Sequence, residues 1–171
     1  MKKNILIAVI SIISIGIKSQ IAIGKETISS NAVSLEFSDA ENRGLILPYV
    51  ETKSGITENG SIIYDTTDHK VKYLKDGSWF DLSVDGTGQA NLSIQQGKTE
   101  LTTAKVSMGT NTTDTADGIL VLSDTDKAMI LPRVASPHLN VINPAPGMMV
   151  YDTVKKQLAV FNGTVWSFWK P

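Results

Sequence analysis

The feature that most constrains this chain is an amino-acid pattern that occurs twice. Three segments of the first half return in the second half: GSIIYDT at 60–66 as GMMVYDT at 147–153, IAIG at 21–24 as VSMG at 106–109, and LILP at 45–48 as MILP at 129–132. The copies keep the same order along the chain, and the spacing between copies changes by only a few residues. This regularity indicates an internal duplication of one small unit.

The duplication divides the chain into four predicted regions. We expect a signal peptide at 1–19, a first β repeat module at 20–83, a connector at 84–104 and a second β repeat module at 105–171. The short basic start, the apolar run at 5–17 and the polar residues that follow are typical of a secretory signal. The apolar run is shorter than the roughly 20 residues that span a bilayer. We therefore expect cleavage after Ser19, no membrane span afterwards, and a secreted protein of the periplasm, outer surface or medium.

Each copy has the pattern of β-strands. The segment 33–37 alternates apolar and polar residues, as a half-buried strand does, and Asp76-Gly77 is a strong signal for a tight turn between two strands. The second copy repeats this arrangement with strands at 147–151, 157–161 and 164–169. The predicted fold class is all-β, with two tandem copies of a small three-stranded meander. The longer loop of the second copy allows one helical turn within 136–142.

The connector has a different composition from the modules. Residues 84–104 are polar and punctuated by glycine, and Leu92 and Ile94 are two residues apart. The glycines suit a flexible linker, whereas apolar residues at this spacing suit narrow strands. We expect strands over the linker, so that the two modules are joined by a Gly-rich polar segment with some β character.

The size of the module predicts association. A unit of roughly 65 residues buries only about 60% of its surface and is marginal alone. The chain has no cysteine, so disulfides do not stabilise it, and an unpaired edge of a small sheet favours pairing with another chain. We expect either a two-module sandwich or an intertwined oligomer, and among oligomers we favour a trimer.

Several segments resemble a family of exported proteins of Bacteroidetes. The RGLILP and KAMILPR segments at 43–48 and 127–133 resemble its KGLLLPR motif, and residues 143–153 with 160–166 are similar to its NPAxGLxxYNT…YNGTxW hairpin, which also occurs in phage tail-fibre-like chains. The resemblance implies an exported surface or fibre-like protein and carries no catalytic residue. The first copy departs from the motif at Tyr49, where the second copy has Arg133.

Reactive chemistry has little support in the sequence. His69 and His138 lie in turn-like segments at unmatched positions of the repeat, and no Ser-His-Asp set or zinc motif is evident. The acidic segments at 114–118 and 124–126 lack the spacing of an EF-hand loop, so turn roles are favoured over calcium binding. With 16 Lys+Arg against 17 Asp+Glu, the basic excess of a nucleic-acid-binding protein is absent. We expect no enzyme activity, no cofactor, no metal and no nucleic-acid partner.

Two sets of residues remain as candidates for recognition and modification. Aromatic side chains that stack on sugars are candidates for glycan binding, namely Trp169, Tyr64, Tyr151 and Trp166. Core packing is the favoured role for Trp79 and Trp166, because their positions coincide in the two copies, and Trp169 is the expected exposed ring. Threonines that follow aspartate resemble O-glycan acceptors of the same exported proteins, namely Thr66, Thr115 and Thr153, although Asp-Thr is also ordinary turn chemistry.

These observations predict a secreted, non-enzymatic structural or interaction protein. It would be a component of a surface fibre or an adhesin, assembled through β edges. The alternative is a carbohydrate-binding module that uses exposed aromatic rings. A hydrolase is the third hypothesis, since small sites can lie on any β scaffold.

Overall fold

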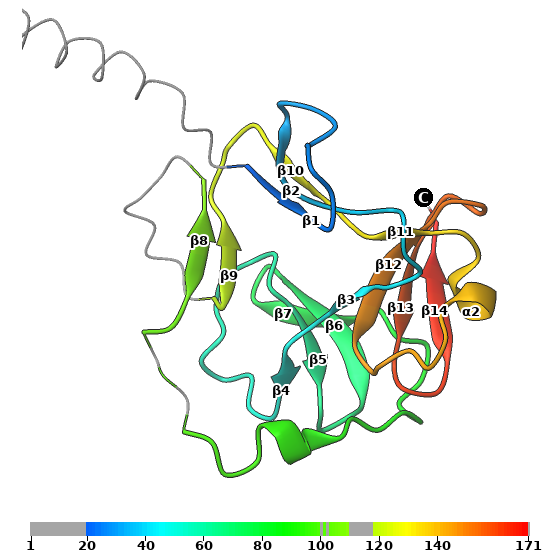
Figure 1. The fold of residues 1–171 in the computed structure, drawn as a ribbon. Helices are drawn as coiled ribbons and strands as arrows, with labels where there is room; N and C mark the ends of the chain where they lie inside the picture. The colour runs from blue at the N-terminus through cyan, green and yellow to red at the C-terminus, as the bar shows by residue number, and fades with distance from the viewer. Residues whose placement is uncertain (1–19, 100, 102, 110–117, 171) are drawn as a thin grey trace, which may run out of the picture.

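The computed structural model describes residues 20–99, 101, 103–109 and 118–170, and the chain is nearly all-β (Figure 1). The predicted fold class is confirmed. The expected signal peptide at 1–19 lies outside the described residues. Within the described residues each half contributes seven strands in the same order, and those of the first half are β1 (Ile21–Ile23), β2 (Val33–Phe37), β3 (Leu45–Ile46), β4 (Tyr49–Val50), β5 (Ile62–Asp65), β6 (Lys70–Lys75) and β7 (Ser78–Asp81).

The second half repeats this order. Its strands are β8 (Val106–Met108), β9 (Leu120–Leu122), β10 (Ala128–Ile130), β11 (Arg133–Val134), β12 (Met148–Asp152), β13 (Gln157–Phe161) and β14 (Trp166–Trp169). The pairing repeats as well: β1 lies parallel to β2 as β8 does to β9, and β4 lies parallel to β5 as β11 does to β12. We call the two halves module 1 and module 2.

The meander of each module follows from its turns. Strands β5, β6 and β7 pair antiparallel in sequence, and so do β12, β13 and β14. Asp76 and Gly77 both have positive φ (51° and 71°), which is the backbone of the tight hairpin turns that match the twist of antiparallel strands. The dipeptide therefore places β7 directly beside β6, as the sequence predicts.

Two connecting segments complete the fold, and one of them differs from expectation. The connector does not form strands at Leu92 and Ile94. Instead, residues Leu92–Ile94 form the 3-10 turn η1, because the side chain of Asn91 accepts a hydrogen bond from Ser93 N (3.0 Å) and caps it. This local side-chain bond competes with extended structure. The predicted helical turn of the longer loop is present as α2 (Pro137–Asn140).

Strands of one module pair with strands of the other. Strand β2 of module 1 pairs with β10 of module 2, and β3 of module 1 pairs with β12 of module 2. The alternating sequence of β2 predicts a strand with one buried and one exposed face. Because of these pairings, both faces of β2 are covered instead. Its polar residues Ser34 and Glu36 are 1% and 0% exposed, since β1 and β10 flank the strand and Asp124 pairs with Ser34 while Lys25 and Ser29 pair with Glu36.

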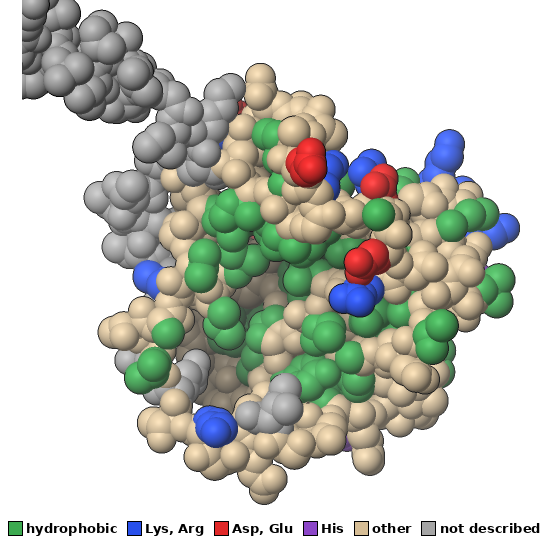
Figure 2. Space-filling view, viewed as in Figure 1, with side chains coloured by type: hydrophobic (Ala, Val, Ile, Leu, Met, Phe, Trp, Pro, Cys, Tyr) green, Lys and Arg blue, Asp and Glu red, His purple; other side chains and the backbone are tan. Residues whose placement is uncertain are grey.

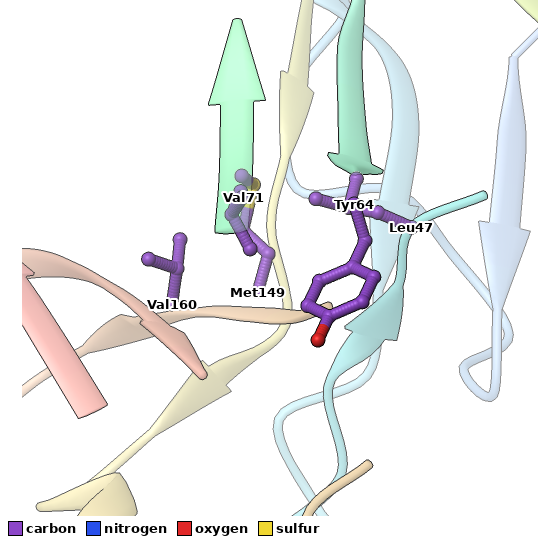
Figure 3. Packing of buried hydrophobic residues seen from close by; sticks show 5 residues of the cluster. All are labelled: Leu47, Tyr64, Val71, Met149 and Val160. Carbon is purple, nitrogen blue, oxygen red and sulfur yellow. The ribbon is translucent and has the colours of Figure 1, made fainter. Parts of the chain in front are cut away.

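The main core lies between the modules. Leu47, Tyr64 and Val71 of module 1 pack with Met149 and Val160 of module 2 (Figure 3). A second cluster belongs to module 2 and contains Val134, Met148, Val150, Ala159 and Phe161. Because one core is built from both halves, each module is stabilised by apolar surface that the other supplies.

Candidate functional site: the docking interface between the modules

Tyr64 is the centre of the interface. Its side chain is fully buried, its hydroxyl donates a hydrogen bond to Asn162 O of module 2 (2.8 Å), and its ring lies 5.4 Å from that of Tyr49. Burial raises the pKa of Tyr64 to about 12, and the neighbouring Tyr49 and Asp68 add to the rise. The Tyr49 hydroxyl reaches across as well and donates to Pro146 O (3.0 Å). Both tyrosines therefore join the modules through polar as well as apolar contact.

Strand β3 of module 1 pairs antiparallel with the edge of β12. Leu47 N donates to Gly147 O (3.1 Å), and Ile46 and Leu45 lie opposite Met148 and Met149. The Leu47 side chain is buried in the main core. The pairing satisfies backbone groups along the first half of β12, while β11 pairs with its second half. Strand β12 thus has partners along both edges.

The start of the connector is strapped onto module 2. Val84 N donates to Ser167 Oγ (2.8 Å), and the Asn162 side-chain amide donates to both Asp85 O (3.0 Å) and Asp85 Oδ1 (2.7 Å). A Cβ at Gly88 would lie 1.8 Å from Asn162 O, so only glycine allows the backbone this close approach. Asn162 therefore holds Tyr64 through its carbonyl and the connector through its side chain.

Buried charged groups hold β2, the other strand of module 1 that pairs with a strand of module 2. The Glu36 carboxylate in β2 accepts hydrogen bonds from Lys25 Nζ (2.6 Å) and Ser29 N (2.7 Å). These two bonds lower the pKa of Glu36 to about 2, against the opposing effect of burial. Arg133 of module 2 lies 3.6 Å from the same carboxylate and 3.0 Å from Asp39. Arg133 thus links β11 to module 1, whereas its counterpart Tyr49 packs on Tyr64.

The two Tyr-Asp-Thr segments have equivalent structural roles. Burial alone would raise the pKa of each aspartate, but hydrogen bonds from Lys53 and Thr67 lower that of Asp65, and backbone N–H groups of Lys155, Val154 and Ser136 lower that of Asp152. Each carboxylate ties down the turn that follows it. Of the proposed acceptors, Thr153 is exposed, Thr66 is half-buried with its hydroxyl donating to Val50 O, and Thr115 lies outside the described residues.

The four aromatic candidates for glycan binding occupy different surroundings. Tyr64 is in the core and has no surface to offer. Trp166 is half-buried against Phe161, at 5.2 Å between ring centroids. Tyr151 and Trp169 are 37% and 46% exposed. The Trp169 indole N–H donates to Leu82 O (2.6 Å), which fixes the ring as a further strap between modules. The structure does not bring the four rings onto one face.

The interface also contains open apolar space. A hollow of about 430 Å³ is lined by residues of both modules, namely Gly60, Ile62, Tyr73, Leu82, Met129, Leu131, Met149 and Leu158. Figure 2 shows hydrophobic side chains gathered around a hollowed part of this face. The described residues hold no cluster of three or more His, Asp or Glu side chains placed to bind a metal ion. Within the same residues, no helix is long and apolar enough to cross a membrane.

Sequence reasoning did not identify Asn162, Gly88 or Glu36 as interface residues. Asn162-Gly163 is a visible turn signal, but nothing in a local pattern tells which distant segment its carbonyl contacts. Glu36 occupies the polar phase of an alternating strand, which ordinarily indicates exposure to solvent. The only signal available was the repeat itself, since equivalent positions that differ in chemistry, such as Tyr49 and Arg133, mark places where the modules have different neighbours.

Comparison with known proteins adds one finding. Residues 107–170 match a family described as a phage tail like trimerisation region. The matched segment spans module 2 almost completely and includes β9 to β14. The match supports self-association of the chain and a fibre-like structural character. Neither a curated protein nor a solved structure matches the chain.

Proposed function

We propose that this chain is a secreted, non-enzymatic structural protein that assembles into a trimer and forms part of a fibre-like surface structure, with adhesion as its role. The single observation that carries this proposal is the match of module 2 to a trimerisation region of phage tail type. The matched stretch covers nearly all of module 2, and module 1 repeats the strand order of module 2. A pair of such units in one chain suits a repeated, extended assembly.

Exposed apolar residues on strand edges support assembly. Val106, Leu120 and Ile119 at the β8–β9 pair are 52%, 41% and 63% exposed, and Ile21 and Ile23 of β1 are 38% and 46% exposed. Such residues on short, open strands favour pairing with a further chain. The basic and apolar N-terminal segment and the resemblance to exported proteins support delivery to the cell surface or beyond.

The oligomeric state tests this proposal. Residues 20–171 would be purified and measured by light scattering and native mass spectrometry across a range of concentrations. We expect a species of three chains that dissociates on dilution. A chain that stays monomeric at high concentration would contradict the proposal.

The second candidate is glycan binding, which the exposed ring of Trp169 favours. This ring is 46% exposed, and its indole N–H donates to Leu82 O. A fixed, flat aromatic surface suits stacking on a sugar ring. We expect iodide to quench the fluorescence of Trp169 strongly, with Trp169→Phe as the control. Absence of any signal on a glycan array would remove this candidate.

A further inference from the structure

The docking between the modules uses one face of each. We define the entering face of a module as its third strand, the leucine after it and the tyrosine of the Tyr-Asp-Thr segment. In module 1 these are Leu45, Leu47 and Tyr64. We define the receiving face as the strand residues that accept them, which in module 2 are Gly147, Met149 and Val160. Within one chain, the entering face of module 1 is docked on the receiving face of module 2.

The repeat gives each module both faces, so two faces are left over. The entering face of module 2 consists of Met129, Leu131 and Tyr151, and the receiving face of module 1 consists of Gly60, Ile62 and Tyr73. Their exposure differs from that of the docked faces: Tyr151 is 37% exposed where Tyr64 is 0%. Ile62 is half-buried where its counterpart Met149 is buried. Met129 and Leu131 of the first face and Gly60, Ile62 and Tyr73 of the second line the apolar hollow of about 430 Å³, where Ile62 and Leu131 also pack at the border of the main core, whereas Tyr151 lies outside the hollow.

The same difference appears at the strands that flank the faces. Strand β2 is covered by β10, and its Leu35 is 1% exposed. Strand β9 is the equivalent strand of module 2, and it pairs with β8 alone among the strands of the described residues. Its Leu120, the counterpart of Leu35, is 41% exposed. In the described part of the chain, module 2 therefore has an open strand edge where module 1 has a paired one.

The backbone of β10 is arranged to pair on both sides. Ala128 N donates to Ala32 O next to β2 (3.0 Å), so backbone groups of one parity point to that strand. Groups of alternate residues in a strand point to opposite edges. The counterparts of residues 129 and 131 in module 1 are Leu45 and Leu47, of which Leu47 N bonds to Gly147 O. The β2–β10 register shifts between Ala128 and Met129, so the equivalence of the second edge of β10 to the edge of β3 that pairs with β12 rests on this correspondence within the repeat.

We infer that a second copy of this chain docks on these free faces in the register that the two modules use within one chain. The inference rests on the proposed self-association and specifies its interface. The entering face of module 2 in one copy contacts the receiving face of module 1 in the next, with Met129 opposite Ile62 and Ile130 opposite Ser61. Strand β9 of the first copy pairs with β3 of the next, with Leu120 opposite Leu45.

This interface joins two different surfaces, so each copy offers one of each to its neighbours. A head-to-tail contact of this kind either closes into a ring or continues as a filament. The match to a trimerisation region favours closure by three chains. Every further copy then covers one open β9 edge and one exposed Tyr151.

Engineered disulfides test the register, because the chain has no cysteine of its own. Leu47 N bonds to Gly147 O, so Ile46 and Met148 form the adjacent non-hydrogen-bonded pair of the β3–β12 contact. The Cα atoms of such a pair are about 4.5 Å apart, which suits a disulfide. The double variant Ile46→Cys/Met148→Cys is the control for the observed contact, and Ser61→Cys/Ile130→Cys tests the inferred one.

After mild oxidation at a concentration where native mass spectrometry detects the oligomer, the control is expected to form its disulfide within one chain. The test variant is expected to convert most of its chains into covalently linked dimers and trimers, seen on a non-reducing gel. An oligomer in which the test variant stays unlinked, or forms its disulfide within one chain, would overturn the inferred register and leave the proposed trimer standing. Linkage between chains by Ile130→Cys/Met148→Cys instead would show that like modules pair. A monomer at every concentration would overturn both proposals.

Discussion

Strands β2 and β9 occupy equivalent positions of the repeat and have opposite surroundings. Strand β2 lies between β1 and β10 and its five residues are buried or half-buried, whereas the Leu120 side chain of β9 is 41% exposed. Strand β9 (Leu-Val-Leu) is wholly apolar while β2 contains Ser34 and Glu36, so composition alone would predict the opposite difference. The observed difference arises because module 1 has the other module as a neighbour on this side. Burial in a duplicated protein is therefore set by the docking of units as much as by each unit.

The equivalent tyrosines of the two modules, Tyr64 and Tyr151, also differ in burial because of docking. Replacing each of them by alanine is the test with the largest expected effect. Tyr64→Ala would leave a cavity in the shared core and remove the bond to Asn162 O, so we expect a loss of about 3–5 kcal/mol in the free energy of unfolding. Tyr151→Ala, at the equivalent exposed position, is the matched control, with an expected loss below about 1 kcal/mol in dilute protein. Urea unfolding would measure both. Equal losses would mean that the two modules are equally covered.

The connector strap offers a second way to disturb the comparison, because it contacts module 2. Gly88→Ala would place a Cβ against Asn162 O, and we expect the strap to be displaced at a cost of about 2 kcal/mol. Gly55→Ala is the control, since a Cβ there meets no atom within 4 Å, and its melting temperature is expected to stay unchanged or rise slightly. An unchanged melting temperature for Gly88→Ala would show that the strap does not depend on close approach at this glycine.

The buried aspartates of the two Tyr-Asp-Thr turns differ in their partners, and salt should separate them. Asp65→Asn and Asp152→Asn are each expected to cost about 1–2 kcal/mol at neutral pH. The folded protein lowers the pKa of both groups, so the stability they supply is present above their unfolded pKa near 3.8 and is lost as pH falls through the folded pKa. Asp65 pairs with Lys53, so its contribution should also weaken in high salt, while that of Asp152, held by backbone N–H groups, should not. Thermal melts at two ionic strengths would measure this, and the same salt effect at both positions would count against the assignment.

The smallest expected effect is a loss of folding stability at alkaline pH, where Tyr64 ionises. The pKa of Tyr64 is raised from 10 to about 12, so its contribution to stability is complete below pH 10 and is lost as pH rises toward 12. In Tyr64→Phe, the ultraviolet absorbance titration should lack the one tyrosine that ionises near pH 12. Between pH 10 and 12 this variant should lose less stability than the native protein. A tyrosine absorbance curve that is the same in Tyr64→Phe and the native protein would contradict the burial of this hydroxyl.

Local features of the fold were predictable from the sequence. The alternation at 33–37 and the Asp76-Gly77 turn fix a strand and a hairpin through backbone preferences that neighbouring residues determine. The repeat predicts equivalent meanders, and both are present. The 3-10 turn at Leu92 was missed because a single capping bond from Asn91 outweighs the weak alternation of the connector.

The candidate site was much less predictable, because it depends on contacts between residues far apart in the sequence. Ser34 bonds to Asp124 Oδ2 (2.7 Å) and Tyr64 bonds to Asn162 O, across 90 and 98 residues. The tandem copies suggest that such docking exists, but they do not tell which face of one copy meets which face of the other. The sequence pattern accordingly predicts Tyr64 as a candidate surface ring and the two matched tryptophans as core residues, whereas Tyr64 is buried and Trp79 and Trp166 are half-buried.

Amide hydrogen exchange of β9 as a function of protein concentration tests the central claim most directly, since it observes the open strand itself. In dilute protein, residues 120–122 should exchange quickly while residues 33–37 of β2 exchange slowly. At concentrations where three chains associate, β9 should become protected to a similar degree, with no change in β2. Exchange in β9 that is already slow in the monomer, or that stays fast in the oligomer, would contradict the account.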